Sequence, residues 1–178
     1  YTSSNTSVAS VSGNTVRITG VGRTTITAEQ SGNGNYKEAI AVSQTLTVTP
    51  REITVTANSG QSKVYGNTDP NLSYTITNGS LVNSDVLTGS LTRVIGEDAG
   101  LYAIEQGSLA NANYQITFVS ANFEITKADQ NISFSPLSNV VYGDSDFNLS
   151  ATSDSGLPVS YTSSNTSVAS VSGNTVRI

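Results

Sequence analysis

Three aspartates are the residues whose type and spacing come nearest to a metal site. Asp144 and Asp146 stand two residues apart in the segment GDSDFN, and Asp69 holds the matching place in a related segment. Carboxylate oxygens in loops are the ligands that calcium prefers. However, the longer run of alternating acids and the distal glutamate of a strong calcium loop are missing. Solvated turn residues are the commoner outcome of such a pattern, so we assign no metal ligand and leave calcium binding open.

Two lysines are candidates for covalent chemistry. In some surface domains a lysine forms an amide bond with an asparagine beside a buried acid, and Lys63 and Lys127 are candidate donors of this kind. Nothing in the sequence singles out a matching asparagine and acid. Because most lysines lie at the surface, we assign no cross-link and leave this alternative open as well.

The tyrosines suggest binding or packing roles. Exposed rings can stack on sugars, although the chain has no tryptophan and core packing is the commoner role. The candidates for this are Tyr1, Tyr74, Tyr102 and Tyr161. Tyr36 and Tyr114 each follow an asparagine just before a late strand. We predict that they act as tyrosine corners, in which the hydroxyl binds the backbone of a loop.

The missing residue types exclude several functions. The 178 residues contain no histidine and no cysteine, so imidazole acid–base catalysis, thiol chemistry and disulfides are excluded. The net charge is −5 and the eight basic residues are scattered, which argues against nucleic acid and anionic membranes as partners. No apolar run reaches the length that spans a bilayer. We therefore expect a protein that is not an enzyme, has no cofactor and does not insert into a membrane.

A long internal identity organises the chain. Residues 1–18 and residues 161–178 both read YTSSNTSVASVSGNTVRI. An identity of this length does not arise by chance, so the chain is expected to be a window from a longer array with a 160-residue period, in which Tyr1 recurs as Tyr161.

A fainter similarity divides this period into two related domains. VYGNTDPNLS at 64–73 aligns with VYGDSDFNLS at 141–150, which places Val64 on Val141. We predict one whole domain at 51–127. A second domain is split, with its first part at 128–178 and its last part at 1–50.

Alternation of polar and apolar residues predicts β-strands throughout. β-branched threonine on the polar face supports this prediction. The expected strands cover 7–11, 15–19, 23–28, 45–49, 53–57, 71–77, 90–94, 101–104, 114–119 and 122–126. Short strands separated by turns predict small antiparallel β-sandwiches of immunoglobulin-like type. For the middle domain, a β-grasp sheet with one short helix is the alternative, and the segment SDVL, capped by Ser84, is the only helical turn that we expect.

The linkers between the predicted domains are short. Only 127–130 separates the middle domain from the next, and 49–52 on the other side includes a proline. Linkers this short hold neighbours nearly end to end, unlike flexible Gly/Ser tethers. We therefore predict a semi-rigid rod that lengthens by about 80 Å with each repeat, at about 3.3 Å per strand residue.

Several motifs resemble known domain families. Over 51–127 the strings KVYG, DVLTGSLTR, GLYAI and NYQITFVSANFEITKA resemble the MBG domain, YGX type. The strings NISFSPLSNVVYGD, LPVSYTSSNTSVASVSGNTVRI and GVGRTTITAEQSGNGNY resemble the bacterial Ig-like repeats that alternate with it. The resemblance implies large secreted or cell-surface proteins of bacteria, often gliding or biofilm adhesins, in which these modules form stalks or filaments. It implies no catalytic residues.

Two functions remain in view. The first is a structural stalk or filament segment that acts as a spacer outside the bacterial cell. The alternative is a multivalent module that binds glycans or associates with itself. The split domain is expected to be completed by the neighbouring repeat of the same chain. In an isolated fragment, head-to-tail copies can complete it by strand exchange, and 1–18 then competes with 161–178 for one position.

Overall fold

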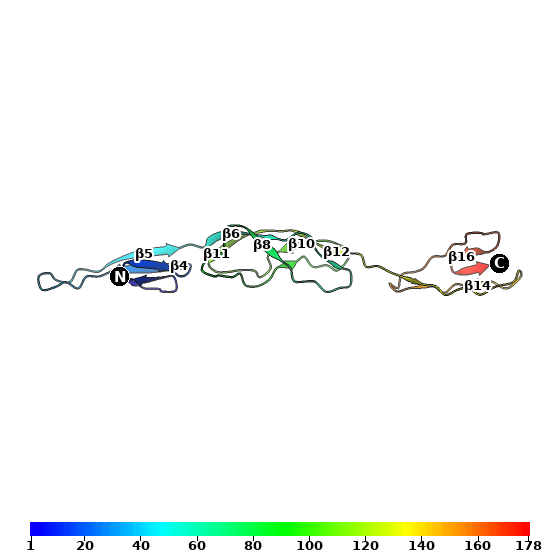
Figure 1. Ribbon diagram of the computed structural model, residues 1–178, viewed down its shortest axis with the longest axis horizontal. Helices are drawn as coiled ribbons and strands as arrows, with labels where there is room; N and C mark the ends of the chain where they lie inside the picture. Colours follow the sequence, from blue (N-terminus) through cyan, green and yellow to red (C-terminus); the bar gives the residue numbers. More distant parts are fainter. The chain divides into compact units, whose positions relative to one another are not determined.

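The computed structural model describes residues 1–178 and contains strands but no helix (Figure 1). The all-β prediction is therefore confirmed. The chain forms two compact units, Tyr1–Thr126 and Lys127–Ile178, which are described separately below. The structure accordingly contains no helical segment that could span a membrane.

Residues 1–50 form one small sheet and one hairpin. Their strands are β1 (Thr2–Ser3), β2 (Ala9–Ser12), β3 (Thr15–Ile18), β4 (Gly22–Ala28) and β5 (Val42–Val48). β4 pairs with β1 on one side and with β5 on the other, and β2 pairs only with β3. The buried Thr24 holds this arrangement together, because its hydroxyl accepts the N–H of Asn5 at 3.0 Å and bonds with the hydroxyl of Ser3 at 2.8 Å.

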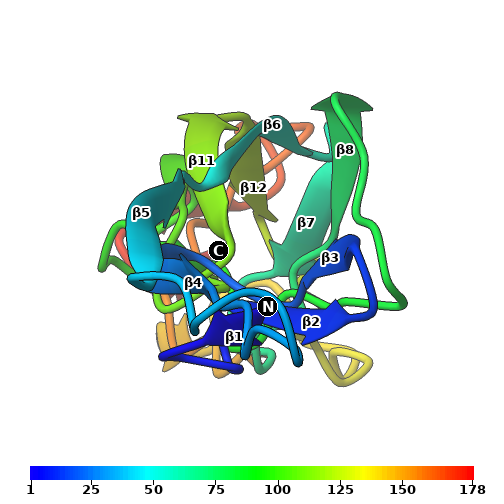
Figure 2. The same ribbon diagram turned by 90° about the vertical axis from the view of Figure 1, so that its left-hand side faces the viewer.

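The following domain, 51–126, contains two sheets. Its strands are β6 (Arg51–Ala57), β7 (Gln61–Val64), β8 (Tyr74–Asn78), β9 (Thr92–Arg93), β10 (Gly100–Glu105), β11 (Tyr114–Val119) and β12 (Asn122–Thr126). One sheet has the order β11-β6-β8, which Figure 2 shows side by side, and the other has the order β7-β12-β10-β9. The pairs β11–β6 and β12–β7 are parallel. The sheets of this domain are therefore mixed, and these two pairs differ from the antiparallel pairing that we expected, because strand alternation carries no information about strand direction.

Alternating side chains of these strands build one apolar core. Ile53 and Val55 of β6 are buried, as are Phe123 and Ile125 of β12 and Ile104 of β10. The buried residues of one strand stand at every second position, as expected when one face of a strand turns inward. The core therefore lies between the two sheets, as in a sandwich.

The predicted helical turn at Ser84 is wrong. Asn83 and Ser84 both have positive φ angles, 54° and 62°, and the N–H of Asp85 donates to the carbonyl of Val82 at 2.9 Å. Two successive left-handed residues closed by this hydrogen bond make a type I′ turn. The alternative of a β-grasp sheet with a helix is not observed. The first strand of the domain, β6, does run parallel to β11, and the last strand, β12, runs parallel to β7.

The second unit contains only short strands. They are β13 (Ile132–Ser133), β14 (Phe147–Asn148), β15 (Thr152–Ser153), β16 (Ser170–Ser172) and β17 (Thr175–Arg177). β13 pairs with β15, and β17 lies between β14 and β16; all these pairs are antiparallel.

The two segments whose alignment places Val64 on Val141 make the same turn. The N–H of Asn67 donates to the carbonyl of Val64 at 3.1 Å, and the N–H of Asp144 donates to that of Val141 at 3.0 Å. The third residue of each turn is a glycine, with φ of 86° at Gly66 and 94° at Gly143. A positive φ at this position defines a type II turn and favours glycine, which explains the shared Tyr-Gly pair.

The two identical 18-residue segments also fold alike. β2 and β3 pair with Val11 opposite Val16, and β16 and β17 pair with Val171 opposite Val176, the equivalent residues of the second copy. The hairpin is therefore determined locally, by its strand alternation and its Gly-Asn turn.

Candidate functional site

A short junction joins residues 1–50 to the domain that follows. β5 ends at Val48 and β6 begins at Arg51, so only Thr49 and Pro50 connect them. Proline restricts its own φ angle and also the conformation of the residue before it. The connection therefore has little conformational freedom.

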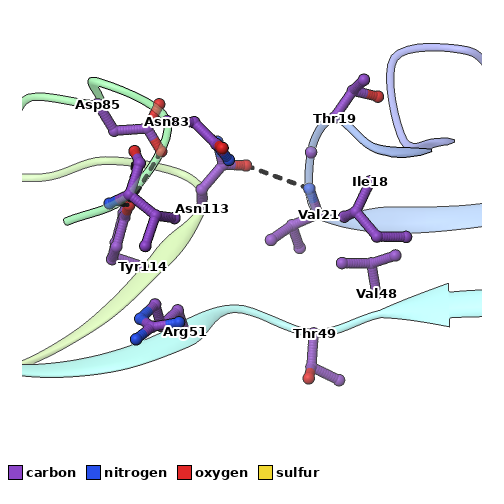
Figure 3. A pocket seen from close by; sticks show the side chains of 12 residues that line it. Ile18, Thr19, Val21, Val48, Thr49, Arg51, Asn83, Asp85, Asn113 and Tyr114 are labelled. Carbon is purple, nitrogen blue, oxygen red and sulfur yellow. Dashed lines mark hydrogen bonds between the residues drawn. The ribbon is translucent and has the colours of Figure 1, made fainter. Parts of the chain in front are cut away.

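Asn113 ties both sides of this junction together. Its side-chain oxygen accepts the N–H of Val21 at 3.1 Å, which Figure 3 shows as a dashed line across the gap. Its backbone carbonyl accepts the N–H of Arg51 at 2.9 Å. The N–H of Asn113 itself donates to the side chain of Asn111 at 2.9 Å, which holds the loop in place. One residue thus connects the loop before β4 to the start of β6.

A small cleft lies beside Asn113, and its charged side chains are Arg51 and Asp85. Asp85 accepts the hydroxyl of Tyr114 at 3.0 Å, and that hydroxyl also accepts the N–H of Val82 at 2.8 Å. These bonds secure the type I′ turn against β11. The carboxylate and the hydroxyl of this cleft therefore have structural partners.

An ionic cluster connects the two edge strands of the sheet β7-β12-β10-β9. Lys63 pairs with Asp69 at 2.7 Å and with Glu97. Arg93 pairs with Asp69 at 2.6 Å and with Glu97 at 2.7 Å. The side chains of Lys63 and Arg93 are only 4% and 6% exposed, whereas both acids reach solvent. Two shielded cations thus share two acids that cover them.

The sheet register explains why the cations point inward. Lys63 lies on the edge strand β7 opposite the buried Ile125, and Arg93 lies on the other edge strand, β9, opposite the buried Ile104. Neighbours in register point to the same face of a sheet, here the core face. Inward-pointing charges on edge strands also discourage pairing with other sheets, which protects both edges from aggregation.

Arg93 contacts more kinds of group than any other member of the cluster. Its guanidinium carbon lies 5.0 Å from the ring centre of Tyr102 and 5.3 Å from that of Phe123. Its N–H groups also donate to the carbonyls of Val94 and Gly96. A planar group with five donors suits this combination of carboxylates, carbonyls and aromatic faces.

The charges of the cluster oppose amide formation at Lys63. Arg93 and then Lys63 lower the pKa of Asp69 to about 2, so this carboxylate stays ionised at neutral pH. Asp69 and then Glu97 raise the pKa of Lys63, so the amine stays protonated. Amide formation needs an uncharged amine and a protonated carboxyl group. The cluster therefore favours an ionic network. Lys127, the other candidate, is exposed and makes no ion pair.

The cluster predicts how stability depends on pH. The cations also lower the pKa of Glu97, so both acids bind protons less readily in the folded domain than in the unfolded chain. Their stabilisation is present above the ordinary carboxyl pKa and is lost as the pH falls through the lowered values. We expect the protection factors of the β12 amides, their exchange rates relative to an unfolded peptide at the same pH, to fall between about pH 4 and pH 2.

The raised pKa of Lys63 adds an alkaline limit. Its stabilisation is present below the ordinary lysine pKa and is lost as the pH rises through the higher value of the folded state. On the acid side, a stability of β12 that stayed constant from neutral pH down to about pH 2 would contradict this assignment of the cluster.

The aspartates considered for calcium have other roles. Both oxygens of Asp69 are engaged by Arg93 and Lys63. One oxygen of Asp144 accepts the N–H of Val141 at 2.7 Å and so closes its own turn. Asp146 is exposed. The structure brings together no group of three or more acidic side chains that could hold a metal ion.

The tyrosine predictions have mixed outcomes. Tyr114 ties a loop to its strand through its hydroxyl as expected, but the loop lies 32 residues upstream. Tyr36 is 76% exposed, so a corner role there is wrong.

Three of the four tyrosines proposed as sugar platforms pack against other side chains. Tyr102 stacks with Arg93 and donates to the carbonyl of Asp98 at 2.8 Å. Tyr161 packs edge-on against Phe134, while Tyr74 is half-buried against the core of the 51–126 domain. Tyr1 alone exposes most of its surface.

The comparison with family models identifies the middle domain. Residues 53–124 match the model described as MBG domain (YGX type). This segment is an MBG domain. Domains of this family are typical of repetitive bacterial surface proteins. The search of curated proteins found no match, and neither did the search of solved structures.

The match gives the ionic cluster a place in the MBG domain. Lys63 belongs to the KVYG string and Arg93 ends the DVLTGSLTR string, two of the motifs that carried the resemblance. Sequence reasoning did not connect them, and it missed Glu97 and the junction residue Asn113. A lysine and an arginine next to apolar strand residues were the available signal. The resemblance of 1–50 and 128–178 to Ig-like repeats stays a prediction.

Proposed function

We propose that this chain is a spacer segment of a repetitive bacterial surface protein, in which successive domains are held in a defined orientation. The observation that carries the proposal is the junction at Thr49–Arg51, where a two-residue connection is secured by Asn113. A flexible tether would need a longer, Gly/Ser-rich linker. On this proposal the protein acts outside the cell, catalyses no reaction and adds length to the surface protein.

The identity of residues 1–18 with residues 161–178 supports the same proposal. Tandem copies of one module add length to a protein and repeat the same neighbour contacts. The MBG domain supports a surface location, since that is where domains of this family are typically found. No observation favours glycan binding over the spacer role, because three of the four candidate tyrosines are only partly exposed.

Replacing Asn113 by alanine is expected to loosen the junction with little loss of fold stability. The variant removes the hydrogen bond to Val21, worth about 1 kcal/mol, and leaves the core intact. The chain lacks cysteine, so spin labels can be placed at Arg17→Cys and Glu124→Cys, both exposed positions. We expect one narrow distance distribution by electron paramagnetic resonance, and a broader one in Asn113→Ala.

The matched control is Asn71→Ala, an exposed asparagine of the same domain that does not line the junction cleft. It is expected to leave the distribution narrow. A broad distribution in the unchanged chain would overturn the spacer proposal, since it would show that the domains are loosely tethered.

A further inference from the structure

The first and last segments of the MBG domain run side by side in the same direction. β6 pairs in parallel with β11, beginning with Arg51 opposite Tyr114. A few residues further along both segments, β7 pairs in parallel with β12, ending with Val64 opposite Thr126. Each segment therefore crosses from one sheet of the domain to the other next to its partner. We call this pairing of the two segments the parallel ladder.

The strands at which the chain enters and leaves the domain are both central strands. β6 lies between β11 and β8, and β12 lies between β7 and β10. Their second neighbours, β8 and β10, are antiparallel to them. Neither β6 nor β12 can therefore slide along its own axis without breaking hydrogen bonds on both of its sides.

Tension along the chain would reach this domain at opposite ends of the parallel ladder. The chain enters β6 at Arg51 and leaves β12 at Thr126, and Figure 1 shows these strands toward opposite ends of the domain. In a parallel pair, pulling one strand at its N-terminal end and the other at its C-terminal end slides the strands past each other. The hydrogen bonds between them are then loaded together. In an antiparallel pair the two loaded ends would be neighbours, and the bonds would open one after another.

Both loaded ends are secured by further hydrogen bonds. At the entry, the N–H of Arg51 donates to the carbonyl of Asn113 at 2.9 Å. At the exit, the hydroxyl of Thr126 donates to the carbonyl of Lys63 at 3.2 Å, and the carbonyl of Thr126 accepts the N–H of Tyr65 at 2.8 Å. The ladder is thus extended at the two points where pulling would begin.

We propose that the MBG domain bears tension, and that the parallel ladder is the element that resists it. This function rests on the proposed spacer role, because a spacer that holds something away from a surface carries load along its length. Forced unfolding is governed by the rate of unfolding, so a ladder that must break as a whole delays it. The expected property is a resistance that depends on the direction of pulling.

Pulling the same ladder in two directions tests this proposal in the full chain. The chain has no cysteine, so pairs of engineered cysteines can carry the handles of a single-molecule force experiment. In Glu52→Cys/Lys127→Cys the load acts along the ladder. In Glu52→Cys/Gln115→Cys it acts across the ladder, because Glu52 and Gln115 are opposite each other in register. At one loading rate we expect an unfolding force at least about threefold higher in the first variant, because many hydrogen bonds share the load.

The comparison separates direction from stability. Glu52, Lys127 and Gln115 are all exposed, so both variants are expected to unfold at the same midpoint in chemical denaturation. An unfolding force along the ladder that was equal to the force across it, or lower, would overturn the proposal. Failure of the spacer role has a different signature, since a broad distribution of spin-label distances leaves the ratio of the two forces unchanged.

Discussion

Replacing Arg93 by methionine is expected to lower the unfolding free energy of the MBG domain by about 2 kcal/mol, the scale of losing hydrogen bonds between charged groups, since the acids left behind still reach solvent. Methionine keeps most of the apolar stem but removes every contact of the guanidinium group. Asp69 and Glu97 then share one cation, Lys63, and the faces of Tyr102 and Phe123 lose their charged neighbour. Chemical denaturation followed by circular dichroism measures the change.

Two further variants define what Arg93 contributes. Arg93→Lys retains the charge but not the planar fork, so we expect about half of the loss. Arg51→Met is the control, because Arg51 is exposed and makes no ion pair. If Arg93→Met were no less stable than Arg51→Met, the cluster would contribute nothing to the fold. The acid-dependent loss of stability should also be smaller in Arg93→Met.

Replacing Gly89 by alanine is expected to destabilise the same domain by about 3 kcal/mol or more, the range of strained and overpacked sites. Gly89 has a φ of +87°, which side chains rarely adopt. A β-carbon there would also meet the backbone of Ser108, with the carbonyl carbon at 2.6 Å and the oxygen closer still. That backbone is held by the hydrogen bond from Ser108 to Ser90 at 3.0 Å, so it cannot easily move.

Gly66 provides a matched control for this prediction. Its φ is +86°, but a β-carbon there would have no neighbour within 4 Å. Gly66→Ala therefore carries the backbone strain alone, which is about 1 to 2 kcal/mol. The difference between the two variants measures the contact with Ser108. Equal losses in thermal or chemical denaturation would show that this contact does not constrain the fold.

Local patterns predicted most strands and failed where pairing is remote. The alternating runs at 53–57, 114–119 and 122–126 became β6, β11 and β12. β7, at Gln61–Val64, was missed because it is short and polar and is stabilised by pairing with β12, which is remote in the sequence. Alternation also could not show that this pairing is parallel, since it reports which face of a strand is buried and nothing about direction.

The candidate sites show the same division. Asp69 was considered as a calcium ligand because its neighbours in sequence resemble a loop, but its partners are Lys63 and Arg93 on two edge strands. Asn113 carried no signal at all, since its partner Val21 lies 92 residues away. In both cases the role of the residue depends on a contact with a residue that is remote in the sequence, and the residue's own sequence neighbours do not predict that contact.

The amino-acid sequence by itself determined the long internal repeat, the all-β class and the hairpin that both copies of the 18-residue segment form. Each of these depends on identity or on neighbours a few residues apart. Only the tertiary structure decided the parallel pairs, the ionic cluster, the Asn113 junction and which face of each hairpin is covered. The reason is physical: burial and charge pairing depend on residues that folding brings together, so one 18-residue sequence has two different surroundings.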